Sequence, residues 1–418
     1  MGKLTYEWKL VLLLALLFGI IGLDRFAVVY LFPVIVPELD INNTQAGAIA
    51  SILALTYAIA TWLLGSYSDK HGRKKVLIFS TLFFSLMTWL TGLAKSFGSM
   101  LAIRALLGVG EGGVFSTSVA TISESVKPKH KGLMLGVHQA FFPLLGIGVG
   151  PIIATQLNQY MPWEAVFFVV GIPGVLLAFG LQRVMKAESP KVIQPIEEPK
   201  EKESVTKNKK SESIFAILKV RNVWVATLMS CCFQSGLYVF STFVSLYLTQ
   251  VVKLPLSSVG FIISGWGFGG ALGMIIMPSL SDKLGRKPVV FFCSAIYGVL
   301  MFVFAFSTTL TPMEMFSLLA FAGIFGFGLA PIYLAIIPAE SVSPDQAGSA
   351  VGLPTCVGEL TGGVLMPIIA GGLADLFGLH ITMIIVGVAF ALICALSILF
   401  RETAPVKMPL NAIKIAAE

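Results

Sequence analysis

The stretch GSYSDKHGRKK at residues 65–75 is a basic loop set between two long apolar runs, and its core occurs twice. SDKHGRK at 68–74 returns 213 residues later as SDKLGRK at 281–287. Two further motifs repeat 216 residues apart: ESVKP at 124–128 returns as ESVSP at 340–344, and PIIA at 151–154 returns at 367–370. Three motifs in register predict a chain of two halves built from one duplicated unit.

Apolar stretches long enough to cross a membrane make up most of the chain. Of its 418 residues, 56% are hydrophobic and 12% are charged, whereas soluble domains carry roughly 25% charged residues. A transmembrane helix needs about 20 predominantly apolar residues. Twelve stretches meet this condition: 9–37, 44–67, 76–94, 97–121, 132–157, 163–183, 223–250, 256–279, 288–307, 312–337, 347–374 and 380–400. The sequence therefore predicts an all-α membrane protein with twelve transmembrane helices in two pseudo-symmetric six-helix bundles.

Residues 184–222 interrupt this pattern. They are rich in Lys, Glu, Ser and Pro, a composition typical of a solvated linker. We therefore expect an N-terminal bundle at 1–183, a cytoplasmic linker at 184–222, a C-terminal bundle at 223–400 and a cytoplasmic tail at 401–418.

Basic residues gather on one side of the predicted membrane. The loop 70–75, the loop 127–131, the linker and the loop 283–287 carry most of them, and the other side holds little beyond Lys95 and Lys253. The positive-inside rule then places both termini in the cytoplasm. This asymmetry explains the net charge of +7 without a nucleic-acid partner. We expect a multi-pass protein of a cell membrane, in the first instance a prokaryotic inner membrane, that functions as a monomer in the lipid bilayer.

Four charged residues lie near the middle of two apolar stretches. Asp24 and Arg25 interrupt the first stretch, and Arg104 and Glu111 interrupt the fourth. An ionisable side chain at that depth is costly, so it persists when it is paired or has a function. Arg104 and Glu111 are seven residues apart and share a helix face, with Gly108 between them leaving room for a helix or a ligand. Adjacent residues point about 100° apart, so Asp24 and Arg25 are expected to have separate partners.

The second half lacks all four charges. A shift of 216 residues leads to Phe240, Ser241, Ala320 and Phe327. Since the fold does not require these charges, we interpret them as a binding and proton-coupling site. The alternatives are a structural ion pair within 97–121 and mutual neutralisation at 24–25. Function is favoured because arginine is the natural bidentate ligand of a carboxylate.

Other polar residues also lie within apolar stretches. Three roles fit Glu359: a second proton site, a substrate contact, or a partner for a polar group on a facing helix. Gln234 and Tyr238 are four residues apart and share a helix face, so we expect a second wall of the cavity there. Of the neighbours His138 and Gln139, we favour Gln139 as a cavity residue, with an interhelical hydrogen bond as the alternative.

The sequence offers no chemistry of an enzyme. It contains no metal-ligand spacing, no nucleophile elbow and no phosphate-binding loop. All of the cysteines lie within apolar stretches and are expected to be small buried hydrophobic residues. They are Cys231, Cys232, Cys293, Cys356 and Cys394. We expect no cofactor, with protons as the coupling ion and sodium left open.

The repeated loop, the two sets of six stretches and the central linker together resemble the major facilitator superfamily. The resemblance covers the whole chain and implies the major facilitator fold. In that family the loop joins the second and third helices and helps to hold the outward-open state, so that it acts as a gate. The residues to which the resemblance assigns gating are Gly65, Asp69, Arg73, Asp282 and Arg286. The second copy departs from the pattern, because Pro278 stands where the leading glycine belongs.

Within the superfamily, the Asp-Arg pair at 24–25 and the Arg-x6-Glu pattern at 104–111 are similar to the anion:cation symporters, which include sialin-like and sugar-acid transporters. There the arginines hold a substrate carboxylate and the acids take up and release protons. The resemblance thus implies substrate binding by Arg25 and Arg104 and proton coupling by Asp24 and Glu111. Tyr57 matches an aromatic residue that lines the site in those relatives. Spinster-like lipid transporters share a similar arrangement, and an antiporter-type glycine motif is present only in part at 146–155.

The resulting hypothesis is a proton-coupled symporter that imports a small organic anion, a carboxylate, by alternating access. Two bundles would enclose a midplane cavity and rock about it. Substrate binding is expected at Arg25, Arg104, Tyr57, Gln139, Gln234, Tyr238 and Glu359. The alternatives are a proton-coupled antiporter that exports lipids or amphiphilic drugs, and an uncoupled facilitator. A monocarboxylate, a sugar acid and an aromatic acid all remain open as substrates.

Overall fold

The computed structural model describes residues 5–127, 130–185, 220–307, 309–343 and 346–404. Within these ranges it is nearly all helical, and twelve helical spans have the length and composition to cross a membrane. The spans are Tyr6–Tyr30, Asn43–His71, Arg73–Thr91, Phe97–Ser125, Lys131–Leu157, Trp163–Val184, Arg221–Val251, Leu256–Leu284, Arg286–Phe306, Pro312–Glu340, Ala347–Phe377 and His380–Ser397. The predicted fold class is confirmed. Most of the predicted linker and tail lies outside the described residues.

Seven of the spans are uninterrupted α-helices: α3 (Asn43–His71), α4 (Arg73–Thr91), α5 (Phe97–Ser125), α8 (Trp163–Val184), α11 (Leu256–Leu284), α12 (Arg286–Phe306) and α17 (His380–Ser397). The predicted first span differs, because it divides at Leu31 into α1 (Tyr6–Tyr30) and α2 (Phe32–Glu38). Pro33 stands in the first turn of α2, where a proline fits without breaking a hydrogen bond.

The other four spans each contain a short π-helical segment. They are α6 (Lys131–Phe141), η2 (Phe142–Val149) and α7 (Gly150–Leu157); α10 (Arg221–Leu246) and η3 (Tyr247–Val251); α13 (Pro312–Pro331), η4 (Ile332–Ile336) and α14 (Ile337–Glu340); and α15 (Ala347–Gly358), η5 (Glu359–Leu365) and α16 (Met366–Phe377). Such segments widen the helix locally and occur often at functional sites.

Glycines of the repeated loop set the sharp turns that end two long helices. Gly72 follows α3 with φ 95°, and Gly285 follows α11 with φ 104°. A residue with a side chain rarely adopts such angles, so glycine is the residue that lets α4 and α12 start at once in a new direction. The other end of α3 is fixed by a capping box, in which Asn42 and Gln45 bond each other's backbone.

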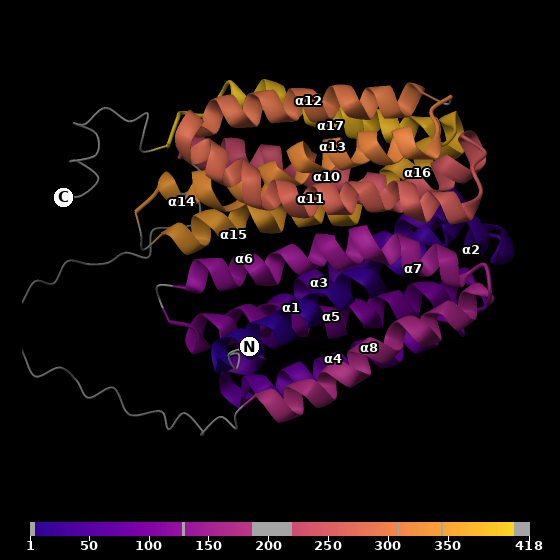
Figure 1. The fold of residues 1–418 in the computed structure, drawn as a ribbon, viewed down its shortest axis with the longest axis horizontal. Coiled ribbons are helices and arrows are strands. Elements are labelled where there is room, and N and C mark those ends of the chain that lie inside the picture. Colours follow the sequence, from indigo (N-terminus) through magenta and orange to yellow (C-terminus); the bar gives the residue numbers. More distant parts are fainter. Residues whose placement is uncertain (1–4, 128–129, 186–219, 308, 344–345, 405–418) are drawn as a thin grey trace, which may run out of the picture.

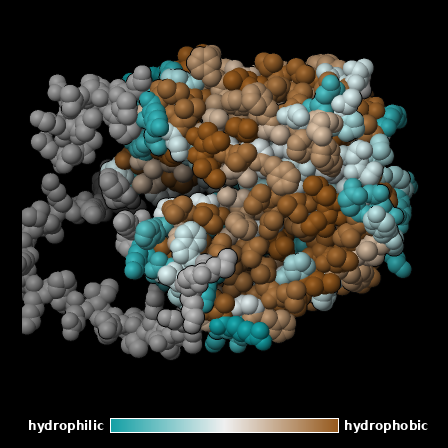
Figure 2. All heavy atoms as spheres, in the orientation of Figure 1, coloured by the Kyte–Doolittle hydropathy of each residue, from teal (hydrophilic) through white to brown (hydrophobic). Residues whose placement is uncertain are grey.

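The helices form two bundles, α1–α8 and α10–α17, which lie side by side in Figure 1. A broad hydrophobic surface covers the middle of the molecule, with hydrophilic residues towards the two ends (Figure 2). Large apolar side chains such as Trp62, Phe79 and Phe292 are exposed. A soluble protein rarely exposes so much apolar surface, whereas a membrane protein presents it to lipid.

Two of the three repeated motifs meet at one end of the molecule, which we call the triad end. In the first half Arg73 lies 3.0 Å from an Asp69 oxygen and 2.8 Å from a Glu124 oxygen. In the second half Arg286 pairs in the same way with Asp282 and Glu340. Each triad joins its own half internally, so the repeat is a repeat of structure as well as of sequence.

The third repeated motif, PIIA, forms the seams between the halves at the opposite end, which we call the latch end. Gly47 of α3 packs on the carbonyl of Pro367 in α16, and Gly260 of α11 packs on the carbonyl of Pro151 in α7. A Cβ atom at either glycine would overlap that backbone. Each repeated proline therefore receives a glycine from the other half.

An acid reinforces one of these seams. Asp375 of α16 accepts hydrogen bonds from the backbone and side-chain groups of Asn43 and Thr44, with distances of 2.6–3.0 Å. The carboxylate thus caps the N-terminus of α3 from the other half of the molecule. We call this contact the latch.

The seams and the latch join the two halves at the latch end. Among the described residues, the hydrogen bonds between the halves are those of the latch, one from Gln156 to Ser257, one from Ser245 to Val29, and one at the centre from Arg25. None lies at the triad end. Ser245 and Val29 are 216 residues apart, so α1 and α10 meet at equivalent positions of the repeat.

Candidate functional site

Arg25 on α1 is the centre of the site. Its Nε and one terminal nitrogen donate to the same oxygen of Glu111 on α5, at 3.0 and 2.8 Å. The guanidinium carbon also lies 4.2 Å from the centre of the Tyr57 ring on α3. Both charges are buried, with Glu111 0% exposed. Charge-assisted hydrogen bonds and a cation–π contact therefore hold the guanidinium in one orientation.

Arg104 on α5 makes contacts to the backbone of α1. Its terminal nitrogens donate to the backbone carbonyls of Asp24 and Arg25, at 3.3 and 2.6 Å. Glu111, on the same helix face, is paired with Arg25 instead. Arg104 therefore fixes the backbone of α1 at the residues that carry the other two charges. Gly108 lets α5 pack closely against α3, because a Cβ atom there would overlap the backbone of Leu53.

Asp24 points away from the centre of the site. One carboxylate oxygen accepts a hydrogen bond from Thr88 on α4 at 2.9 Å, and no ion pair of Asp24 is present among the described residues. Arg25, its neighbour in sequence, faces the second half. The two residues thus have separate partners, as their angular separation predicts.

The second half contributes a chain of polar side chains. Tyr238 on α10 accepts a bond of 3.4 Å from Arg25 and donates one of 2.5 Å to Glu359, the first residue of η5. Gln234, one turn before Tyr238, donates to the other oxygen of Glu359 at 2.8 Å. A continuous line of hydrogen bonds therefore runs from Glu111 through Arg25 and Tyr238 to Glu359 and Gln234.

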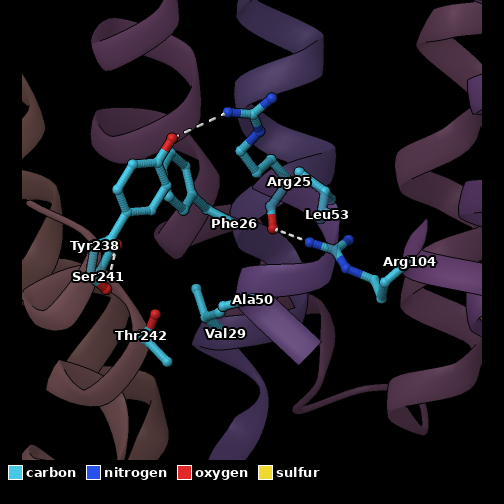
Figure 3. A pocket seen from close by; sticks show the side chains of 9 residues that line it. All are labelled: Arg25, Phe26, Val29, Ala50, Leu53, Arg104, Tyr238, Ser241 and Thr242. Carbon is cyan, nitrogen blue, oxygen red and sulfur yellow. Dashed lines mark hydrogen bonds between the residues drawn. The ribbon is translucent and has the colours of Figure 1, made fainter. Parts of the chain in front are cut away.

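A small pocket opens beside this line, between α1, α3, α5 and α10 (Figure 3). Its lining residues are Arg25, Phe26, Val29, Ala50, Leu53, Arg104, Tyr238, Ser241 and Thr242. Two arginines and three hydroxyl groups face apolar side chains across it. Binding pockets for small molecules commonly combine an apolar wall with a few placed polar groups in this way.

Three buried polar atoms in the site have no hydrogen-bond partner in the structure: Asp24 Oδ1, Arg104 Nε and Glu111 Oε1. Buried polar atoms are nearly always paired, so each exception calls for an explanation. Here two are carboxylate oxygens and one is a guanidinium nitrogen. A proton on either acid would remove the negative charge from its unpaired oxygen, and an anion beside Arg104 would accept a hydrogen bond from its Nε.

Several predicted residues lie apart from this cluster. Gln139 on α6 is half-buried and makes no side-chain hydrogen bond to the groups described above. Its neighbour His138 is buried, with its ring stacked on Phe18 at 4.8 Å. The gating residues Asp69, Arg73, Asp282 and Arg286 lie in the two triads, and Gly65 packs near Ser116.

The cysteine prediction is wrong in part. Cys293 is buried, but Cys356 on α15 is exposed and the remaining three are half-buried. An apolar stretch predicts a membrane span, yet it does not say which face of that span packs against protein. No cluster of His, Cys, Asp and Glu that would hold a metal occurs in the described part of the chain.

The residues that sequence reasoning missed are uncharged. Thr88, Phe26 and Thr242 resemble many other residues of apolar stretches in the sequence. Only their contacts in the structure identify them as residues of the site. Ser241 did carry a signal, because it is the repeat equivalent of Arg25. The two repeat-equivalent residues line the same pocket.

These features define a membrane transporter with a central polar site between two repeated bundles. The chain belongs to the Major Facilitator Superfamily, whose family profile matches residues 14–360. The resemblance inferred from the repeated loop is confirmed. The expectation that the protein is not an enzyme is also confirmed, because the relatives found are transporters.

Three bacterial relatives illustrate the similarity. A probable 4-methylmuconolactone transporter of Cupriavidus pinatubonensis is 26% identical, covering 87% of this chain and 83% of the relative. The hexuronate transporter of Bacillus subtilis is 27% identical over 88% of both chains. The cis,cis-muconate transport protein of Acinetobacter baylyi is 25% identical over 95% of both.

A solved structure shares the fold. It is that of a bacterial homologue of the human lysosomal transporter Spinster in an inward-facing, unoccupied conformation, with a TM-score of 0.77. The alignment covers 95% of this chain and 97% of the other, at 17% identity. At this identity the likeness concerns the arrangement of the helices.

Proposed function

We propose that this protein is a proton-coupled symporter that imports a small organic anion carrying a carboxylate. Relatives named for hexuronate, muconate and sulfoacetate transport support the anion. The observation that carries the proposal is the buried pair of Arg25 and Glu111 beside the pocket. A carboxylate of the protein occupies the guanidinium that a substrate carboxylate would need, so the two compete.

Protonation decides this competition. When Glu111 is ionised, it holds Arg25 through two hydrogen bonds. When Glu111 takes up a proton, its hold weakens and Arg25 is free for the substrate. The loaded site is then neutral at its centre, and it can pass through a closed state without a bare buried charge. Loss of the proton on the other side restores the pair and expels the substrate.

Arg104 and Asp24 support this cycle from the backbone of α1. Arg104 holds the carbonyls of residues 24 and 25 and leaves its Nε towards the site. Asp24, bonded to Thr88, is the second acid available for a proton. A proton there changes the charge next to Arg104 without blocking the pocket.

The distribution of basic residues supports a cytoplasmic triad end, with both termini on that side. In this orientation the latch and the seams lie on the outer side of the membrane.

Replacement of Glu111 by Gln tests the proposal. In proteoliposomes, E111Q should still exchange bound anion across the membrane but should no longer accumulate it in response to an inward proton gradient. Accumulation by E111Q at the wild-type level would show that Glu111 is not the coupling acid. Replacing external sodium by choline shows which ion is coupled to transport, because transport by a sodium-coupled protein would stop and transport by a proton-coupled protein would continue.

Thermal stabilisation gives an independent measurement of the substrate class. A ligand that binds the native state raises the melting temperature. Organic anions should stabilise the wild type more at about pH 5.5 than at about pH 8, in line with protonation of Glu111. Stabilisation by lysolipids or cationic amphiphiles, with no response to anions, would contradict the proposal.

A further inference from the structure

Tyr238 lies between a cation and an anion from different parts of the molecule. Its hydroxyl oxygen is 3.4 Å from Arg25 and 2.5 Å from Glu359. A phenol hydroxyl has one proton to donate. The short distance places that proton on the side of Glu359, so Tyr238 presents only lone pairs to Arg25. In this arrangement Tyr238 cannot donate a hydrogen bond to an anion held by Arg25.

Glu359 is more accessible than the two acids of the first half. It is half-buried, whereas Glu111 is 0% and Asp24 is 1% exposed. It also begins η5, and exposed residues of α15 precede it towards the triad end. Of the three acids, Glu359 is therefore the one least enclosed by protein atoms.

The packing of the second half does not depend on Glu359. Gly358 and Gly362, on either side of it, press directly on Ser230 and Gln234 of α10. Ser230 also donates to the carbonyl of Pro354 at 2.7 Å. These contacts already hold α10 against α15 and η5, so the carboxylate of Glu359 is left for another role.

The polar groups around Glu359 come from three helices. Gln234 and Tyr238 reach it from α10, and Tyr57 from α3 and Arg25 from α1 interact with it electrostatically. Glu111 lies behind Arg25. Arg25 is therefore the cation that faces Glu359, and Tyr238 is the group that joins the two.

We propose that Glu359 and Tyr238 form a proton-controlled hydrogen-bond donor for the substrate, separate from the Arg25–Glu111 pair. With Glu359 ionised, the hydroxyl proton of Tyr238 is held by Glu359. When Glu359 takes a proton from water, that proton forms an O–H bond on the carboxyl group, and Tyr238 no longer has an anion to which it must donate. Its hydroxyl then turns about the Cζ–O bond and donates to the carboxylate bound at Arg25. Glu359 is thus a positioning residue that acts through Tyr238.

This inference rests on the proposed transport of an anion, and the test separates the two. The E111Q background removes the first acid, so the remaining pH dependence of binding belongs to other groups. The probes are cis,cis-muconate, glucuronate and sulfoacetate, applied to the full-length protein in detergent. The measured quantity is the ratio of Kd at about pH 8 to Kd at about pH 5.5.

In E111Q, binding should remain about tenfold tighter at the lower pH, the effect expected of one hydrogen bond to a charged group. In E111Q/E359Q the ratio should fall below about twofold, with affinity close to that of E111Q at low pH, because the amide mimics the protonated acid. In E111Q/Y238F the ratio should also fall, but with the weaker affinity of high pH. In the triple variant E111Q/Y238F/E359Q, the affinity and the ratio should equal those of E111Q/Y238F.

Two matched variants control for general damage. Y247F removes another buried tyrosine hydroxyl, which donates to Ala305. E314Q neutralises a carboxylate that caps α13 away from the site. Both should keep the ratio of the E111Q background. An unchanged ratio in E111Q/E359Q, or independent effects of E359Q and Y238F, would overturn the inference.

A second measurement needs no ligand. Infrared difference spectra between the two pH values should show a protonated carboxyl band that E359Q removes and Y238F shifts. If the wild type binds none of the three anions, the proposed function fails for them and this spectrum alone decides the inference. A spectrum that neither variant alters would refute it.

Discussion

At the scale of single residues, the two arginines of the site make opposite uses of the same side chain. Arg25 meets a carboxylate and an aromatic ring, both of which favour a flat guanidinium. Arg104 meets two backbone carbonyls, which accept from any donor that reaches them. Lysine has three hydrogen-bond donors but no planar fork. Replacing each arginine by lysine therefore distinguishes bidentate binding of a carboxylate from binding of backbone carbonyls.

R25K should weaken anion binding by at least about tenfold, since the ammonium cannot form the bidentate contact or stack as well on Tyr57. Equilibrium binding to purified protein measures the change. R183K, at the end of α8, is the control and should bind as the wild type does. Equal affinities in R25K and wild type would show that the substrate does not sit on Arg25.

R104K should be milder, with a change in Kd of less than about threefold, because an ammonium can still serve the carbonyls of residues 24 and 25. R104A should instead lower the melting temperature, since two buried carbonyl contacts are lost and a large side chain is removed. A loss in R104K as large as in R25K would mean that Arg104 also holds the substrate directly.

At the scale of elements, α3 is the helix that connects all the parts of the mechanism. Its N-terminal end carries Gly47 and is capped by Asp375 of the other half, its middle carries Tyr57, and its C-terminal end carries Asp69. Release of the cap frees one end of this rod while the triad holds the other. We therefore expect the latch to be made in one state of the transporter and broken in the next.

D375A should shift the protein towards the state that is open at the latch end, because four hydrogen bonds to the α3 N-terminus are lost. Spin labels at Lys95 and Phe377, exposed positions of the two halves at this end, report the shift as a longer distance in pulsed electron resonance. E314Q alters a cap within a single half and should leave the distance unchanged. An unchanged distance in D375A would show that the seams alone hold this end closed.

At the scale of the whole molecule, the halves meet at their seams through backbone contacts. Gly47 and Gly260 bring helices together at a distance that no side chain allows. A packed seam of this kind is either closed or open, with few states between, which is what alternating access requires.

G47A should act as a wedge, because its methyl group would overlap the backbone of Pro367. We expect the labels at Lys95 and Phe377 to move apart, and uptake to slow as the closed state becomes rarer. G348A is the control: it adds the same methyl group to a helix where nothing lies within 4 Å. Wild-type distance and uptake in G47A would mean that the seam adapts without opening.

The sequence predicts the repeat, the spans and the cluster of charges for identifiable reasons. A motif such as SDKHGRK is long enough for its second copy to be recognised, and a charge within an apolar stretch stands out. The pairing within the cluster could not be predicted. Helical periodicity gives the face on which Arg104 and Glu111 lie, but not that Arg25 would come between Glu111 and Tyr238.

Asp375 shows the same limit at the surface. In the sequence it is one acid near the end of an apolar stretch, with nothing to link it to Asn43 more than 300 residues earlier. Only the docking of the halves brings the two together. What is local in the chain was predictable, and what depends on the meeting of helices was not.

The glycine seams have a consequence for how such a protein can evolve. They close the molecule through main-chain atoms, whose shape is the same whatever is carried, while the cargo is recognised by a handful of side chains one or two turns away. Closing and recognition can therefore vary independently. A substitution in the pocket can change which anion fits while the seams keep their shape.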